Sequence, residues 1–393
     1  MFKVLNNGLD HPSKQQQARE EFEKVLAGKS VKGVTERALR YDLTIPFARY
    51  VAMNHGQLTF PFKRYQVQPV WRADRPQKGR YREFFQCDAD VVGSTSLWNE
   101  VELASIYAAV FNQLKVPVTI RLNSRKILQG LAECYGGAGR MVDITTAIDK
   151  LDKIGIEKVK EELADAGLEA SAIEGIGRYL LLEGSTPQKL EGARQLLSAS
   201  AIAGQGVDDL TTIVQRLQRS GDCPVEVDLG LARGLNYYTG TIFEVKAVDV
   251  SIGSIGGGGR YDDLTGLFGV PNIPGVGISF GVDRIYDVMD ELNLFPASVH
   301  SATDVLFFNL GEKECERSFE LATLLRKNNV RCEVYAESAR FDRQFKYAER
   351  KQIPYIVIIG NDEIANGTCK LKTLATGQQV DLTTTELLAF HFK

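Results

Sequence analysis

Paired cysteines and clustered histidines are both absent from this sequence of 393 residues. Its six cysteines are scattered without a C-x-x-C pair, a spacing that favours neither a zinc ribbon nor a disulfide framework. The four histidines stand apart in the sequence from any cysteine or carboxylate cluster. The sequence therefore predicts no metal site and no histidine-based nucleophile, and we expect any chemistry to depend on arginines and carboxylates.

Long apolar runs are also missing. No stretch approaches the roughly 20 apolar residues that a membrane-spanning helix needs. Polar residues such as Lys3 and Asn6 follow Met1 closely, without the order of basic, apolar and small residues that is typical of a signal peptide. We therefore expect a cytoplasmic protein with no membrane partner.

Positive charge is concentrated in one segment, although the formal net charge of the whole chain is only -3. Residues 61 to 85 carry seven lysines and arginines against two acidic residues, with tyrosines, phenylalanines and a tryptophan between them. A local excess of this kind favours contact with a polyphosphate or a nucleic acid. A solvated charged face is the alternative, and the interleaved aromatic rings argue against it.

The chain changes pattern twice. Residues 38–122 are typical of β-sheet, and "VPVTIRL" (116–122) alternates as a strand does. Residues 123–220 show helical spacing, broken into short helices by glycines and a proline. Strand patterns return in "PVEVDLG" and "TIFEVKA", so the helical stretch is predicted to be an insertion into a sheet domain, with its two ends close together. After residues 291–300, alternating strands and helices predict a separate α/β domain that ends in the buried strand "PYIVIIG".

The basic segment lies within a predicted hairpin. "RYQVQPVWR" and "REFFQCDADVV" have strand patterns, and "DRPQKG" between them contains turn residues. We expect this hairpin to bring Arg72 opposite Phe84 and Gln86. An arginine grips phosphate through two hydrogen bonds, and a phenylalanine can stack on a purine, so the hairpin favours nucleotide binding.

Two glycine-rich segments follow. The four glycines of "GSIGGGGRYDDLTG" (253–266) could form the floor of a flat pocket, and a flexible loop or bulged strand is the alternative. "GVGISFGVDRI" (275–285) has G-x-G-x-x-x-G spacing instead of the dinucleotide-binding fingerprint. It is predicted to be a strand that leads into a helix carrying Arg284.

Together these segments resemble the second and third signature motifs of class II aminoacyl-tRNA synthetases. In particular, "RYDLTIPFARY", "RPQKGRYREFFQCDAD", "LARGLNYYTG", "GGGGRYDDLTG" and "GVGISFGVDRI" are similar, in order and across nearly the whole chain, to the histidyl-tRNA synthetase family. The resemblance implies that histidine and ATP form histidyl-adenylate, with Mg²⁺, before the histidyl group passes to histidine-specific tRNA.

The resemblance also implies roles for individual residues. Arg72 matches the arginine at the α-phosphate and substrate carboxylate, and Arg233 matches the arginine that faces the α-phosphate from the opposite side; these two are the expected catalytic residues. Arg80 and Arg284 match arginines near the γ-phosphate. Phe84 matches the ring that stacks on adenine.

Histidine binding is implied for a further group of residues. Three match positions that hold the α-ammonium, namely Asp42, Thr44 and Gln86, and the positions that bracket the imidazole are matched by Asp90 and Tyr238. Tyr237, Arg72 and Arg233 are also expected to bind histidine. Other interpretations stay open for some of them. Either tyrosine could be a core aromatic, Asp42 could cap a turn or helix, and the neighbouring Asp88 could be a solvated carboxylate.

The resemblance implies an α+β fold: a class II antiparallel-sheet catalytic domain with a helical insertion, followed by a C-terminal α/β anticodon-binding domain. The expected limits are 1–124 and 223–295 for the catalytic domain, 125–222 for the insertion and 303–393 for the last domain. The insertion would hold the tRNA acceptor stem. In the last domain, basic residues that could meet RNA backbone are Arg340, Arg343, Lys346, Arg350 and Lys351.

The match departs from the family at the beginning of the chain. Only 37 residues precede Ala38, where the family has the first signature motif with its dimer-interface proline, so we expect that region to be missing and the usual homodimer to be affected. Two non-catalytic relatives are alternatives. Synthetase-like regulatory subunits of histidine biosynthesis generally lack the anticodon domain and lose the arginine motifs, and sensor domains of signalling kinases stand beside kinase motifs. This sequence keeps both the anticodon domain and the arginine motifs, and it has no kinase motifs.

Overall fold

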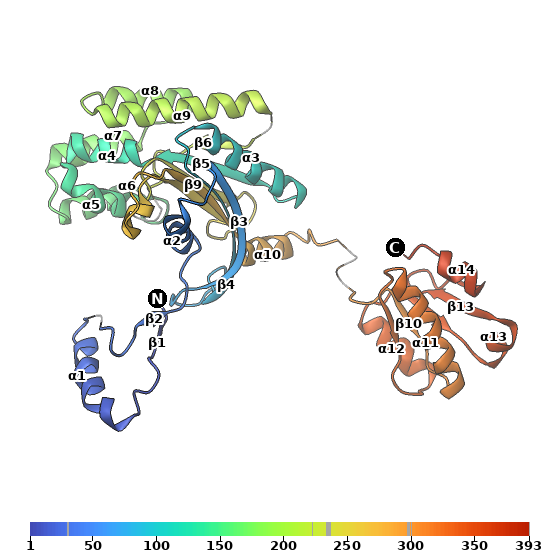
Figure 1. Ribbon diagram of the computed structural model, residues 1–393. Coiled ribbons are helices and arrows are strands. Elements are labelled where there is room, and N and C mark those ends of the chain that lie inside the picture. Colours follow the sequence, from blue (N-terminus) through green and yellow to red (C-terminus); the bar gives the residue numbers. More distant parts are fainter. Residues whose placement is uncertain (30, 222, 233–236, 297–298, 300, 393) are drawn as a thin grey trace. The chain divides into compact units, whose positions relative to one another are not determined.

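A computed structural model describes residues 1–29, 31–221, 223–232, 237–296, 299 and 301–392. The chain divides into two compact units, Met1–Leu294 and Phe295–Lys393, and each is described by itself (Figure 1). Within the described ranges, no helix combines the length and the apolar character needed to cross a membrane.

The first unit is built on a sheet of seven strands. Every neighbouring pair is antiparallel except β5 and β6, which are parallel. The largely antiparallel sheet predicted from the sequence is therefore confirmed. In spatial order the strands are β3 (Phe62–Trp71), β4 (Glu83–Val92), β9 (Gly275–Gly281), β8 (Gly256–Tyr261), β7 (Thr241–Ala247), β5 (Val118–Ser124) and β6 (Val225–Val227).

The predicted hairpin is formed by β3 and β4, but its register differs from the expectation. Val70 lies opposite Phe84 and Gln68 lies opposite Gln86, whereas the Arg72 N–H donates to the Arg82 carbonyl at 2.9 Å. The expectation that Arg72 faces Phe84 and Gln86 was therefore wrong. The arms stay hydrogen-bonded as far as Arg72 and Arg82, so the connecting loop is shorter than a pairing of Arg72 with Phe84 would require.

Helices also occur where the sequence pattern predicted only sheet. In residues 38–122 the structure has α2 (Thr44–Asn54) and α3 (Trp98–Gln113). α3 was missed because it is largely buried and carries apolar residues on several sides, which hides the helical period. The other prediction for the sheet domain is confirmed, since β9 leads directly into α10 (Val282–Glu291), which carries Arg284. A short 3-10 helix, η3 (Leu264–Phe268), follows β8.

Residues between β5 and β6 are helical, as predicted. The helices are α4 (Arg125–Tyr135), η2 (Ala138–Arg140), α5 (Met141–Ile148), α6 (Leu151–Asp165), α7 (Ala170–Leu180), α8 (Thr186–Leu196) and α9 (Ala201–Ser220). Serine hydroxyls cap the beginning of α4 and α9, and a capping box formed by Ser185 and Gln188 begins α8. Helices α4 and α9 contact β5 and β7, and the helices share one apolar core with the sheet (Figure 1).

The first 43 residues add little to this core. β1 (Lys3–Val4) pairs with β2 (Arg37–Ala38) in an antiparallel sheet of two strands. Between them lie η1 (Pro12–Lys14) and α1 (Gln15–Leu26), neither of which has a buried residue.

The second unit is a mixed sheet with helices and has apolar clusters of its own. Its strands follow the order β11 (Cys332–Val334), β10 (Val305–Phe307), β12 (Tyr355–Ile358), β13 (Thr368–Thr373) and β14 (Gln379–Thr383), and the first three are parallel. Its helices are α11 (Glu312–Lys327), α12 (Phe341–Arg350), α13 (Asn361–Asn366) and α14 (Thr384–Ala389). The predicted succession of strands and helices is confirmed, and the β13–β14 hairpin extends the sheet beyond the prediction.

Candidate active site

Three polar side chains follow one face of β4. Side chains alternate along a strand, so Gln86, Asp88 and Asp90 lie on the same face, and each is at least nine-tenths buried. The residues opposite them on β9 are Gly281, Ser279 and Gly277. These residues are small, and the Asp90 carboxylate occupies the space above Gly277.

The Asp90 carboxylate is held on two sides. The Tyr261 hydroxyl donates to Oδ1 at 2.5 Å, and Nη2 of Arg64 lies 2.8 Å from Oδ2. Burial raises the pKa of Asp90 to about 6, while the nearby Arg64 and the Tyr261 hydrogen bond act in the opposite direction. A fixed carboxylate of this kind can accept a hydrogen bond from a ring N–H of a ligand.

Asp42 and Thr44 lie at the beginning of α2. The Ile45 N–H donates to Asp42 Oδ1 at 3.1 Å, which confirms the alternative that Asp42 caps this turn, although its second carboxylate oxygen is not used by that contact. Burial raises the pKa of Asp42, and Arg72 is close enough to lower it. The end of α2 therefore brings Asp42 toward the arginine of the hairpin.

Tyr237 and Tyr238 are in edge-to-face contact, with their ring centroids 5.0 Å apart. Both pack against a small apolar cluster that includes Phe47 and Tyr261, so the core-aromatic interpretation holds for their packing. The Thr44 side chain is close enough to Tyr237 to lower the pKa of that phenol, which burial raises. Burial likewise raises the pKa of Tyr238, with Asp90 and Asp88 as the next contributors, so its hydroxyl is a neutral donor and acceptor beside them.

Arg72 lies near two aromatic rings at the loop end of the hairpin. Its guanidinium carbon is 4.6 Å from the centroid of Tyr41 and 5.1 Å from that of Phe84, and its Nε donates to the Tyr41 carbonyl at 3.3 Å. Stacking on rings holds the planar guanidinium in place without using all of its donors. The structure therefore brings Arg72 and Phe84 together although they are not opposite in register.

Arg284 joins the hairpin loop to the rest of the site. Its Nε donates to the Gly79 carbonyl at 2.5 Å and its Nη1 to the Ser254 carbonyl at 2.6 Å. Arg80 is the next residue after Gly79 and is exposed in a tight turn that pairs it with Gln77. The two arginines predicted to lie near the same phosphate are thus placed on neighbouring segments. Arg233, the other expected catalytic residue, lies outside the described residues.

Sequence reasoning missed some of the side chains that complete the site. Arg64 and Tyr261 fix Asp90, and Ser279 accepts from Nε2 of Gln86 at 2.8 Å. The alternation of β3 could have placed Arg64 on the inner face. Nothing in the sequence shows that Tyr261 meets Asp90, because β8 and β4 are separated by β9 and by more than 160 residues.

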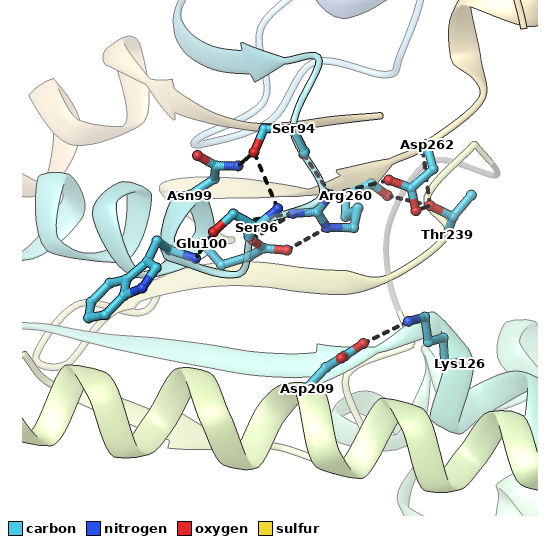
Figure 2. Close-up of polar contacts among 10 residues, drawn as sticks. Ser94, Ser96, Asn99, Glu100, Lys126, Asp209, Thr239, Arg260 and Asp262 are labelled. Carbon is cyan, nitrogen blue, oxygen red and sulfur yellow. Dashed lines mark hydrogen bonds and ion pairs between the residues drawn. The ribbon is translucent and has the colours of Figure 1, made fainter. Parts of the chain in front are cut away.

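A second polar network lies where β8 ends (Figure 2). The Arg260 guanidinium donates to both carboxylate oxygens of Glu100, at 2.6 and 2.7 Å, and lies 3.2 Å from Asp262. Its remaining donors reach the carbonyls of Ser94 and Ser96. Arg260 and Glu100 are almost fully buried, so this ion pair fixes the beginning of α3 against β8, directly before Tyr261.

No group of three metal-ligating side chains occurs within the described ranges. The chemical groups that the site offers are guanidinium ions, carboxylates, phenols and an amide. This set suits a ligand that carries both phosphate and an amine, because the cations and the acceptors lie side by side.

Comparison with known proteins agrees with this arrangement. The profile of the family described as "Histidyl-tRNA synthetase" matches residues 15–285, and that of "Anticodon binding domain" matches residues 304–391. A crystal structure of histidyl-tRNA synthetase from Nostoc sp. PCC 7120 is 31% identical and superposes with a TM-score of 0.78, covering 92% of this chain and 84% of that one. The fold is thus that of a class II synthetase catalytic domain followed by an anticodon-binding domain.

Closer relatives in sequence carry the name histidine--tRNA ligase. The protein from Phocaeicola vulgatus is 53% identical over 355 residues, which cover 90% of this chain and 78% of that protein. The protein from Bacteroides fragilis is 50% identical over 389 residues, covering 99% of this chain and 85% of the relative. With a matched profile across most of its first unit and relatives at this level of identity, the chain belongs to the histidyl-tRNA synthetase family.

Proposed function

We propose that this chain is a histidine--tRNA ligase. A histidine carboxylate oxygen attacks the α-phosphorus of ATP, the bond to the β-phosphate breaks, and pyrophosphate leaves. A hydroxyl of the terminal ribose of histidine-specific tRNA then attacks the carbonyl of the adenylate, and AMP leaves. The observation that carries this proposal is the buried polar row Gln86, Asp88 and Asp90, in a chain about half identical to proteins with that name.

The arginines would stabilise the charge that develops on the phosphate oxygens. Arg72 would bind the α-phosphate and the histidine carboxylate, and Arg233 would meet the α-phosphate from the other side. Arg80 and Arg284 would hold the γ-phosphate, while adenine would stack on Phe84. Preorganised cations are the largest catalytic term expected for such a transfer, since little covalent chemistry is left to the protein.

The choice of histidine would depend on its ring. Asp90 would accept from one ring N–H while Tyr238 serves the other nitrogen, with Tyr237 packed beside it, and few other amino acids could satisfy both. Asp42, Thr44 and Gln86 would bind the ammonium. The hydrogen bond from the Tyr261 hydroxyl to Asp90 and the ion pair of Asp90 with Arg64 support this assignment, because they hold the carboxylate in one orientation.

Magnesium would enter with the nucleotide. Mg²⁺ usually keeps several waters and binds through substrate phosphates with one or two carboxylates, so it does not need a cage of protein ligands. The donor set of the described residues fits this mode, since it holds no group of three metal-ligating side chains. When bound, the ion would neutralise part of the triphosphate charge.

The regulatory-subunit alternative has less support. A protein from Bacillus halodurans, whose title names both an ATP phosphoribosyltransferase regulatory subunit and histidyl-tRNA synthetase, is 21% identical with a TM-score of 0.66, a likeness in fold alone. This chain retains Arg72, Arg284 and a C-terminal unit that matches the anticodon-binding profile.

Histidine-dependent exchange of pyrophosphate into ATP tests the proposal. Wild type should catalyse exchange with histidine and with no other amino acid, and Arg233→Ala should lose roughly 100-fold or more in rate, as expected for removal of one transition-state donor. Exchange with a different amino acid, or none at all, would contradict the proposal.

We further propose the division into a catalytic domain, a helical insertion over 125–222 that contacts the acceptor stem, and an anticodon-binding domain over 303–393.

We also propose a cytoplasmic homodimer. The exposed side chains of Tyr65 and Val67 on the edge strand β3 support self-association, because edge strands with exposed apolar residues favour pairing. Light scattering tests the dimer.

A further inference from the structure

Asp88 is a buried carboxylate of the site that has few hydrogen-bond donors around it. It lies between Gln86 and Asp90 on the inner face of β4, and only 2% of its surface is exposed. Its Oδ1 atom is buried and has no hydrogen-bond partner among the described residues. The interpretation of Asp88 as a solvated carboxylate is therefore wrong.

The surroundings of Asp88 leave it short of positive charge. Burial raises the pKa of Asp88 to about 7, and the neighbouring carboxylates Asp90 and Asp42 act in the same direction. Ser279 and Arg64 oppose them, but Arg64 already forms the ion pair with Asp90. A buried carboxylate without a full set of donors costs free energy, and natural proteins retain such groups chiefly where a ligand supplies the missing partner.

A donor-rich cation fits the missing partner of Asp88. Two residues before Asp88 on the same face of β4, Oε1 of Gln86 is also buried without a hydrogen-bond partner among the described residues. The described carboxylates form no group suited to a metal ion. An alkylammonium has three N–H donors and a positive charge, so it can serve both oxygens and the nearby Asp42 at once.

Position along the strand assigns Asp88 to one end of the ligand. Successive residues of an antiparallel strand rise about 3.4 Å, so Asp88 lies roughly 7 Å from both Gln86 and Asp90 along β4. Tyr261 and Arg64 already contact the two oxygens of Asp90. In contrast, Oε1 of Gln86, which is expected to bind the amine, has no hydrogen-bond partner among the described residues, so the free Oδ1 of Asp88 is grouped with it. We propose that Asp88 is a further binding residue for histidine, accepting a hydrogen bond from the α-ammonium through Oδ1, an inference that rests on the proposed function.

Two ligands that differ only in the amine test this assignment. Calorimetric titration of wild type and Asp88→Asn should use histidine and 3-(imidazol-4-yl)propionate, which keeps the ring and the carboxylate but has no ammonium. We expect Asp88→Asn to bind histidine roughly 10- to 100-fold more weakly, because it loses a hydrogen bond between two charged groups, and to bind the propionate as wild type does.

Two control variants define the outcomes. Asp90→Asn should weaken both ligands, and Asp165→Asn, at an exposed carboxylate of α6, should change neither. Equal weakening of both ligands by Asp88→Asn would assign Asp88 to the ring or to pocket structure, and unchanged histidine binding would remove it from the site; either result overturns the inference. Failure of wild type to bind histidine would instead contradict the proposed function.

Thermal unfolding of the ligand-free proteins at pH 8 separates binding from folding. Asparagine has the shape of aspartate without its charge, so Asp88→Asn should unfold at a higher temperature than wild type while it binds histidine more weakly. If Asp88 were purely structural, its replacement would lower both the unfolding temperature and the affinity for histidine. A lower unfolding temperature would therefore overturn the inference.

Discussion

The Asp90 carboxylate owes its position to a glycine. A Cβ atom added at Gly277 would lie 2.0 Å from Oδ1 of Asp90 and 3.2 Å from the Ala89 carbonyl. Asp90 cannot turn away easily, because Tyr261 and Arg64 hold both of its oxygens. The residue opposite Asp90 on β9 thus has to lack a side chain.

Gly277→Ala should impair histidine recognition selectively. The added methyl group would displace the Asp90 carboxylate, so we expect KM for histidine in pyrophosphate exchange to rise roughly 10- to 100-fold, with a loss of about 1–3 kcal/mol of stability from overpacking. KM for ATP should change little. Gly204→Ala in α9 is the control, since its Cβ would meet no atom within 4 Å, and it should keep wild-type kinetics. Equal effects on both substrates would show that the substitution disturbs the whole sheet.

The two buried carboxylates also predict a pH dependence of stability. Burial raises the pKa of Asp88 to about 7 and that of Asp90 to about 6, from a usual value of 3.8. Between pH 4 and 7 the folded protein therefore retains protons that the unfolded chain releases, and the free energy of unfolding falls as pH rises. The titratable groups that interact electrostatically with Asp88 include Asp90, Arg64, Asp42, Tyr238 and Tyr107.

Comparing the free energy of unfolding of wild type with that of Asp88→Asn isolates the contribution of Asp88 to this pH dependence. Their unfolding free energies should agree most closely below about pH 3, where Asp88 is largely protonated in both states. Above pH 7 the variant should be more stable by on the order of 3 kcal/mol. Denaturant titrations at fixed pH, without histidine, would measure the difference. A difference that does not depend on pH would mean that ionisation of Asp88 is not its cause.

At the scale of elements, the ion pair between Arg260 and Glu100 connects the end of β8 to the beginning of α3 (Figure 2). Glu100 is fully buried, so its removal would leave the Arg260 charge, among the described residues, with Asp262 and the carbonyls of Ser94 and Ser96. We expect Glu100→Ala to cost about 3–5 kcal/mol of stability, as found when one partner of a buried pair is lost.

An exposed ion pair that links the same helix to β3 provides the control. Nζ of Lys63 lies 2.5 Å from Glu102, and both side chains are about half exposed. Glu102→Ala should cost less than about 1 kcal/mol, because solvent screens such a pair. Replacing Arg260 and Glu100 together by methionine should recover much of the loss, and urea unfolding of the four proteins would measure it. A large loss in the double variant would show that packing at this junction requires the charges.

Sequence patterns predicted the elements that have a clear period or turn. The β3–β4 hairpin, the transition from β9 to α10 and the helices between β5 and β6 were found in this way. Helix α3 was missed because its buried residues hide the period, and the hairpin register was wrong because the length of the loop was not fixed by its turn residues. For the site, the family resemblance indicated Gln86 and Asp90, and the structure shows that both lie on one face of β4. Tyr261 could not be found, since its contact with Asp90 depends on the order of strands far apart in the sequence.

At the scale of the whole molecule, the two units have separate apolar cores. The clusters of the first unit contain residues no later than Leu294, and those of the second unit contain residues from Val305 onward. A domain with its own core can fold alone, and the site residues Asp42, Arg72, Asp90 and Arg284 all belong to the first unit. The anticodon-binding profile matches only the second.

A protein that ends at Leu294 should therefore separate the two half-reactions. We expect it to retain histidine-dependent pyrophosphate exchange within a few fold of the full chain, because the residues proposed to bind histidine and ATP all belong to the first unit. Its kcat/KM for tRNA should fall roughly 100-fold or more, since the basic residues of the second unit would no longer neutralise RNA phosphates. Circular dichroism would verify that the shortened protein folds, and the full chain assayed at higher salt should show a similar but smaller loss of charging. If the shortened protein charged tRNA as well as the full chain, the second unit would not be required for tRNA binding, and if it folded but lost exchange, the site would depend on residues beyond Leu294.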